Sequence, residues 1–263
     1  MDWETISFEK KQNGIAILSL NKPESLNAMT SEMGDEFAEC ISRLKADQEA
    51  RILIIRGEGR SFCSGGNIID AFKMYDAPAA EAQRNTIEFY QRFLSVRSLD
   101  IPTVAVIHGH ASGAGLCLAM ACDMRIASTD TKLSMAFIKV SLSPGMGGTY
   151  LMPQLIGTAK AMELCMLGEN IDAQQALQIG LVNHVVEPEQ LMDFALDFAG
   201  RIARNPVIPV RLIKKAIYQG LKSDLDAALN FEAFAQVGCF STGNVQEAIT
   251  AFKEKRPPFL NNI

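Results

Sequence analysis

The stretch Arg51-Ile-Leu-Ile-Ile-Arg-Gly-Glu-Gly-Arg-Ser-Phe-Cys-Ser-Gly-Gly-Asn67 joins an unbroken apolar run to a loop of small residues. An apolar run without polar alternation is typical of a strand buried on both faces of a parallel sheet. The same arrangement returns at Ile101–His108, which is followed by Gly109-His-Ala-Ser-Gly-Ala-Gly115 and an apolar helix. Strands that open through small-residue turns into helices predict an α/β fold.

The flanking sequence extends this pattern in both directions. Residues 6–21 alternate apolar and polar side chains around Asn13-Gly14, which predicts a β-hairpin. Residues 30–46 carry an apolar stripe at helical spacing. From Gly148 onward the pattern is almost entirely helical, interrupted by a short strand within 181–186. We therefore expect repeated β-turn-α units followed by a helical C-terminal appendage.

The composition excludes some classes of protein. The chain has 263 residues, of which 48% are hydrophobic, and a net charge of −5, which argues against nucleic-acid binding. A local basic patch for a phosphorylated cofactor stays compatible with this charge. The six cysteines form no Cys-x-x-Cys pair, which indicates reduced thiols. No apolar run approaches the roughly 20 residues that cross a bilayer, and the N-terminus lacks a signal-peptide pattern. The expectation is a soluble, cytoplasmic protein without a membrane partner.

The two small-residue loops are the candidate chemical site. Glycine, alanine and serine allow backbone N–H groups to approach a ligand closely, and the first N–H groups of a helix have no internal acceptor. Two such loops that converge make a two-donor pocket for an oxyanion. The alternative is that both are tight turns that only pack a helix against the sheet.

Several motifs resemble successive signatures of the crotonase (enoyl-CoA hydratase/isomerase) superfamily. They are Asn21–Met29, Ser61–Asn67, His108–Asp123, Ser143–Thr149, Gly180–Val182 and Ala251–Arg256. Their order and spacing cover nearly the whole chain. The middle region, with Met135-Ala-Phe-Ile-Lys139 and the glycine run, is most similar to the isomerases of aromatic-acid degradation.

The resemblance implies a crotonase spiral of β-β-α units over residues 1–195 and a C-terminal helical region over 196–263 that builds homotrimers or pairs of trimers. It also implies a CoA thioester whose carbonyl oxygen accepts hydrogen bonds from the backbone N–H groups of Gly66 and Ala114. Coenzyme A would be part of the substrate, and no separate cofactor is expected. His108 and His110 form a His-x-His pair, but no third ligand is apparent, so we expect no metal.

Residues for the CoA moiety follow from the same resemblance. They lie in the first motif and in the first small-residue loop: Lys22, Leu26, Ser64, Gly65 and Ile68. Lys255 or Arg256 would supply positive charge for the phosphates, from the same or a neighbouring subunit. The alternative for these two is a solvated helix end.

The sequence departs from the family at the acids. The resemblance places catalytic carboxylates at three positions that here are Cys117, Phe137 and Gly145. Neither phenylalanine nor glycine can transfer a proton, and general acid–base assistance contributes about 10²–10⁴-fold. Cys117 could act as a base or nucleophile if its pKa were lowered, but a small core residue is the other reading. We therefore do not expect efficient hydration by the usual route.

Asp70 and Glu88 are the remaining carboxylates near the predicted site. Asp70 follows the first loop and Glu88 lies where related enzymes project helix residues toward the substrate, so either could move the proton. Their alternatives are a solvated carboxylate and an exposed helix face. Two functions stay open: an isomerase- or hydratase-like enzyme, including decarboxylation of a malonyl-type thioester, or an inactive acyl-CoA-binding or structural homologue.

Overall fold

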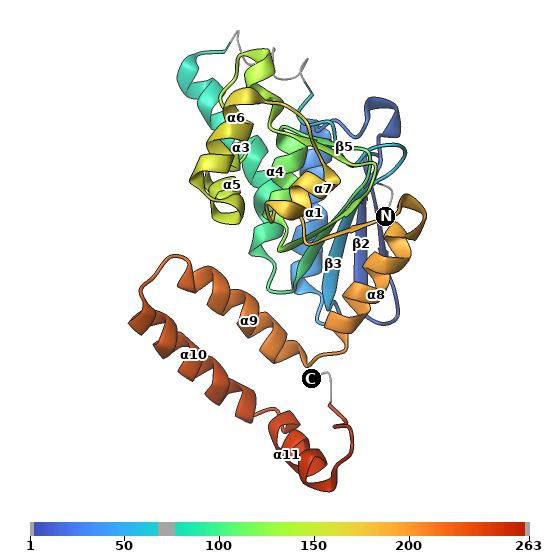
Figure 1. Cartoon of the computed structure of the whole chain (residues 1–263), viewed down its shortest axis with the longest axis vertical. Coiled ribbons are helices and arrows are strands. Elements are labelled where there is room, and N and C mark those ends of the chain that lie inside the picture. Colours follow the sequence, from blue (N-terminus) through green and yellow to red (C-terminus); the bar gives the residue numbers. More distant parts are fainter. Residues whose placement is uncertain (1–2, 68–76, 261–263) are drawn as a thin grey trace.

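The computed structural model describes residues 3–67 and 77–260 and is built on a six-stranded sheet with strand order β1-β2-β3-β4-β6-β9 (Figure 1). Asp70 and Ile68, two predicted site residues, lie outside the described residues. All neighbouring strands are parallel except the β1–β2 hairpin, which confirms the α/β prediction. The strands are β1 (Ile6–Lys10), β2 (Ile15–Leu20), β3 (Ile52–Gly57), β4 (Thr103–Ile107), β6 (Met124–Ser128) and β9 (His184–Val186).

Both faces of this sheet are buried, which is why its strands are continuously apolar. Ile52 and Ile54 of β3 belong to a cluster that α8 covers, through small residues such as Ala195. Leu53 and Ile55 point to the opposite face and join the larger cluster. Successive strand residues face opposite sides, so one apolar run serves two layers of helices.

The helices of the folded body cover both faces of the sheet. They are α1 (Ser31–Ala46), α3 (Ala79–Leu94), α4 (Ala114–Ala121), α5 (Gly148–Ile156), α6 (Thr158–Leu167), α7 (Ala173–Gln178) and α8 (Leu191–Ala203), with the short helices η1 (Pro23–Ser25), η3 (Ser95–Ser98), η4 (Ala136–Val140) and η5 (Pro188–Gln190). The expected helix over residues 30–46 is confirmed, and the Thr30 side chain caps it by accepting from the Met33 N–H.

A second, three-stranded sheet was not predicted from the sequence. Its order is β5 (His110–Ser112), β7 (Lys132–Ser134) and β8 (Ile171–Asp172). β5 follows β4 directly along the chain and β7 follows β6, so these two turns of the spiral contribute a strand to each sheet. This is the repeated β-β-α arrangement that the resemblance implied.

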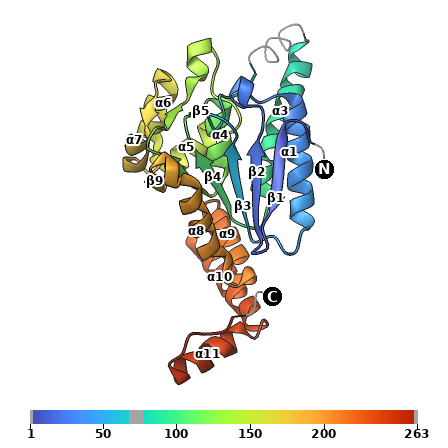
Figure 2. The ribbon, with the colours of Figure 1, turned by 90° about the vertical axis from the view of Figure 1, so that its right-hand side faces the viewer.

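The last three helices form an arm that extends away from the body: α9 (Val207–Gly220), α10 (Leu225–Phe240) and α11 (Asn244–Glu254) (Figures 1 and 2). The Lys214 ammonium of α9 pairs with Asp123 at 2.8 Å, with both side chains largely buried, and thereby ties the arm to the body. The division at residue 195 falls inside α8, and two separate units stay a prediction. Within the described part of the chain, no helix is long and apolar enough to cross a membrane.

Candidate active site

Backbone hydrogen bonds join the two small-residue loops along their length. The Phe62 N–H donates to the His108 carbonyl at 2.9 Å, and the Cys63 N–H donates to the His110 carbonyl at 3.0 Å. The Ser112 N–H returns a bond to the Cys63 carbonyl at 3.0 Å. Because β3 and β4 are parallel neighbours, both loops leave the same edge of the sheet. The convergence expected from the sequence is therefore present.

The two predicted donors lie at the ends of these joined loops. A Cβ added to Gly65 would stand 3.6 Å from the Ala114 nitrogen, so the residue directly before Gly66 lies next to Ala114. Ala114 is the first residue of α4, and its N–H has no acceptor within the helix. Within the described residues, neither N–H has a backbone acceptor. No atom of the described residues lies within 4 Å of a Cβ added to Gly66.

Gly115 allows the loops to come this close. A Cβ at this position would lie 2.8 Å from Cys63 Cβ and 2.9 Å from Cys63 Sγ, and closer still to the Cys63 carbonyl oxygen. Cys63 is fully buried and bonded through its backbone, so it has no room to move aside. The absence of a side chain at position 115 therefore fixes the spacing of the two donors.

The predicted CoA-contacting residues gather around the first loop. The Ser64 N–H donates to the Leu26 carbonyl at 2.9 Å, and the Ser64 hydroxyl donates to the Ser25 carbonyl at 3.3 Å. Lys22, half-buried, begins the same turn, and Gly65 accepts from the Met29 N–H at 2.8 Å. Residues far apart in the chain thus share one rim beside Gly66.

Asn27 holds this rim together, and the sequence analysis did not single it out. Its buried amide donates to the carbonyls of Glu58 and Ser61, both at 2.9 Å, and accepts from the Lys22 N–H at 2.9 Å. The available signal was its place inside the first family-like motif, Asn21–Met29. In the structure its φ is +54°, a conformation that asparagine tolerates better than most residues. Asn27 therefore positions the loop that carries Gly66.

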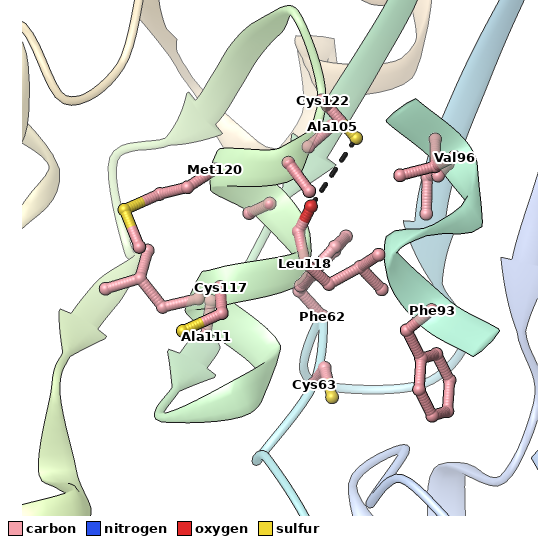
Figure 3. Packing of buried hydrophobic residues seen from close by; sticks show 14 of the residues in the cluster. Phe62, Cys63, Phe93, Val96, Ala105, Ala111, Cys117, Leu118, Met120 and Cys122 are labelled. Carbon is pink, nitrogen blue, oxygen red and sulfur yellow. Dashed lines mark hydrogen bonds between the residues drawn. The ribbon is translucent and has the colours of Figure 1, made fainter. Parts of the chain in front are cut away.

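Cys117, the first of the three positions where the resemblance expects acids, is fully buried in α4. Figure 3 shows Cys117 on one side of α4 and Leu118 on the other, where Leu118 faces Phe93 and Val96. Burial raises the pKa of the Cys117 thiol well above its ordinary value, and the nearby Cys165 adds to this. The thiol donates to the Gly145 carbonyl at 3.4 Å. A protonated, enclosed thiol is neither a base nor a nucleophile at neutral pH.

Phe137 and Gly145, the other two positions, face the same region. The Phe137 ring lies 3.7 Å from a Cβ added to Gly113, so it covers the turn that leads into Ala114. A Cβ added to Gly145 would lie 2.8 Å from Tyr90 Cζ and closer still to the Tyr90 hydroxyl. Tyr90 of α3 therefore occupies the space that a side chain at position 145 would need.

The remaining predicted residues lie elsewhere. Glu88 is exposed on α3. Lys255 caps the end of α11 and is exposed, and both views place α11 at the far end of the molecule from β5 and α4 (Figures 1 and 2). Lys255 therefore does not meet the two loops within its own subunit. His108 Nε2 donates to the Gly59 carbonyl at 2.9 Å, and the described residues contain no cluster of three metal-binding side chains.

Comparisons with known proteins identify the family of this chain. Residues 10–262 match the model of the family described as enoyl-CoA hydratase/isomerase. The chain is 37% identical over 248 residues to the short-chain-enoyl-CoA hydratase of Clostridium acetobutylicum, covering 94% of each chain. It is 35% identical over 248 residues to the 1,2-epoxyphenylacetyl-CoA isomerase of Escherichia coli, covering 94% of this chain and 95% of that one. The crystal structure of an enoyl-CoA hydratase from Bacillus anthracis superimposes with a TM-score of 0.91 at 31% identity, over 99% of this chain and 100% of that one. The chain belongs to the crotonase, or enoyl-CoA hydratase/isomerase, family.

Proposed function

We propose that this protein binds an acyl-CoA and stabilises an enolate of its thioester, in an isomerase- or hydratase-like reaction that does not use the usual pair of glutamates. The observation that supports the proposal is that Gly65, next to Gly66, lies beside the Ala114 nitrogen, and that neither the Gly66 N–H nor the Ala114 N–H has a backbone acceptor among the described residues. Relatives named as hydratases and isomerases of acyl-CoA thioesters support the substrate class.

The donors account for stabilisation of negative charge. Each donor of an oxyanion hole lowers the barrier by roughly 3 kcal/mol, because it is already aimed at the oxygen where charge develops. Both donors are backbone groups, so the alanine at position 114 keeps the donor that a glycine would supply. The thioester oxygen would lie between them, with the acyl chain directed toward Phe137 and Cys117.

The proton step needs another group. Cys117 is buried and protonated, Phe137 cannot carry a proton, and Gly145 has no side chain. Asp70 and Glu88 stay the proposed carriers, with Glu88 exposed on α3. A reaction that needs no base to begin, such as loss of CO₂ from a malonyl-type thioester, fits a site with donors and no carboxylate at these three positions.

The test uses the purified full-length chain with 2-enoyl-, 3-enoyl- and methylmalonyl-CoA, followed by product analysis and thermal unfolding. We expect each thioester that binds to raise the melting temperature, and at least one to give product. Turnover that is unchanged in both Asp70→Asn and Glu88→Gln would remove these carboxylates as proton carriers. If no thioester binds, the oxyanion-hole proposal fails.

The second candidate is a catalytically inactive acyl-CoA-binding or structural homologue. The enclosed Cys117 and the space filled by Tyr90 beside Gly145 favour it, because a binding protein needs the two donors but no proton carrier. A rise in melting temperature with every thioester, without product from any of them, would select this candidate.

The arm supports assembly into homotrimers or pairs of trimers. Large apolar side chains are exposed along it, among them Leu225 (72% exposed), Phe234 (71%) and Phe252 (85%). A subunit packed against the arm would cover them, and Lys255 could then meet the CoA phosphates of a neighbouring subunit. We expect light scattering to give the mass of a trimer or hexamer and Phe234→Ser to shift it toward the monomer. The proposed reaction uses no resident cofactor, because coenzyme A is part of the substrate. We propose a cytoplasmic location for the protein.

A further inference from the structure

A small cavity lies at the base of the arm, where α8 ends and α9 begins (Figure 1). Arg51, Asn205 and Arg211 make the polar part of its wall, and the rest of the wall is apolar. Arg51 directly precedes β3, and Arg211 lies near the beginning of α9. The cavity has a volume of about 10 Å³, which is room for one water-sized species. Two positively charged side chains, one from the body and one from the arm, therefore line the same small space.

Arg211 brings to this cavity a buried donor that has no protein acceptor. Its Nε atom is enclosed, and no described residue accepts a hydrogen bond from it. Among the described residues, it is the one buried side-chain nitrogen or oxygen without a partner. Buried polar groups in folded proteins are nearly always hydrogen-bonded, so such an atom indicates a bound water or ion.

The positive charges at the cavity are poorly compensated. Burial lowers the pKa of Arg51 and the charge of Arg211 lowers it further, so the two guanidinium groups are close enough to repel each other. Glu49 opposes this effect, but its side chain is 83% exposed and its carboxylate already pairs with Lys10 at 2.9 Å. The described residues of the cavity wall include no carboxylate.

An anion satisfies this cavity better than a water molecule does. A water molecule can accept from the Arg211 Nε–H, but it leaves the repulsion between the two guanidinium groups unchanged. An anion accepts the same hydrogen bond and also offsets both charges. Hydrogen bonds in which donor and acceptor are both charged are roughly twice as strong as neutral ones.

We propose that Arg51 and Arg211 bind a small inorganic anion of the size of chloride in this cavity, with the Arg211 Nε–H donating to it. The anion would connect the start of β3 to α9 and so stabilise the docking of the arm on the body. About one turn further along α9, Lys214 already pairs with Asp123 at 2.8 Å. The anion would give the same helix a second charged attachment to the body.

The experiment measures the melting temperature of the full-length protein while sodium chloride replaces sodium gluconate at constant ionic strength. Constant ionic strength keeps the screening of surface charges unchanged, and gluconate is too large for a cavity that holds one water-sized species. Above the dissociation constant, we expect each tenfold rise in chloride concentration to raise the wild-type melting temperature by about 3 °C.

Three variants locate the effect. Arg211→Met should abolish the dependence of the melting temperature on chloride, and Arg51→Met should weaken it. Arg204→Met is the matched control, because it removes an exposed arginine at the end of α8 that does not line the cavity. This control should respond to chloride as the wild type does.

A wild-type melting temperature that does not change with chloride overturns the proposal, because a water molecule would then be sufficient. An Arg211→Met variant that responds as strongly as the wild type also overturns it, because chloride would then act at another place. If Arg211→Met does not fold, Arg51→Met decides the question, and an undiminished response in that variant overturns the proposal as well.

Discussion

Gly115→Ala should separate the two loops that carry the proposed oxyanion donors, Gly66 and Ala114. The new methyl group would lie 2.8 Å from Cys63 Cβ and 2.9 Å from Cys63 Sγ, whereas carbon atoms in contact prefer about 3.5–4.0 Å. Cys63 is fully buried and its backbone is bonded to His110 and Ser112, so the strain must pass into the loops. The distance between Gly66 and Ala114 would change as a result.

The size of the effect follows from two opposing contributions. Overpacking of a tight core costs about 1–3 kcal/mol, whereas alanine in place of glycine in a helix ordinarily gains about 1 kcal/mol. We therefore expect Gly115→Ala to lower the free energy of unfolding by about 1 kcal/mol. Weakening one hydrogen bond to the thioester oxygen should lower the affinity for butyryl-CoA about 3- to 10-fold.

The assay is denaturant unfolding together with calorimetric titration of butyryl-CoA. Gly200→Ala is the matched control, because it lies within α8 and a Cβ there would meet nothing within 4 Å. This control should gain stability and keep its affinity. A Gly115→Ala variant that behaves like Gly200→Ala, with full affinity and no loss of stability, would refute the role given to position 115.

Three further predictions concern stability. Asn27→Ala leaves the Glu58 and Ser61 carbonyls without their side-chain donor, and chemical denaturation should show a loss of about 3 kcal/mol; full stability would contradict the anchoring role. Lys214→Met breaks a pair whose side chains are only 9% and 16% exposed and should cost about 3 kcal/mol, measured in the same way. Burial raises the pKa of the Cys63 thiol to about 12, well above its ordinary value. Above about pH 9 the unfolded chain loses this proton while the folded protein still holds it, so the contribution to the free energy of unfolding is complete below pH 9 and is lost as the pH rises to about 12. A denaturation midpoint that is unchanged across that interval would contradict the shift.

The sheet was largely predictable because burial on both faces leaves a strong signal in a single sequence. Ile52 to Ile55 are apolar without interruption, and the structure shows that alternate residues enter two separate clusters. The second sheet left no such signal, since β5 and β7 have three residues each and β8 has two. Strands this short have no measurable periodicity, and only the register between distant segments reveals them.

The residues of the candidate site were likewise predictable where they lie in local motifs, and not where their role depends on contacts between distant segments. Gly66 and Ala114 were predicted as donors from the family resemblance of two local motifs, and a backbone donor depends mainly on the small residues around it. Asn27 and Tyr90 depend on contacts across the chain: the Asn27 amide bonds residues 31 and 34 positions away, and Tyr90 meets Gly145 across the fold. Their roles become visible only when the fold brings these segments together.

Tyr90 and Gly145 together leave this part of the predicted site without a negative charge. A carboxylate at position 145 would need the space that the phenol occupies, so the chain has a neutral donor there instead of a negative charge. Cys117, next to it, is also neutral because burial keeps its thiol protonated. A pocket with neutral walls at these positions has no carboxylate there to repel negative charge that develops on the acyl chain. Any base must then be a residue other than those at positions 117, 137 and 145. The reaction class therefore depends on which side chain reaches the acyl chain beside Gly66.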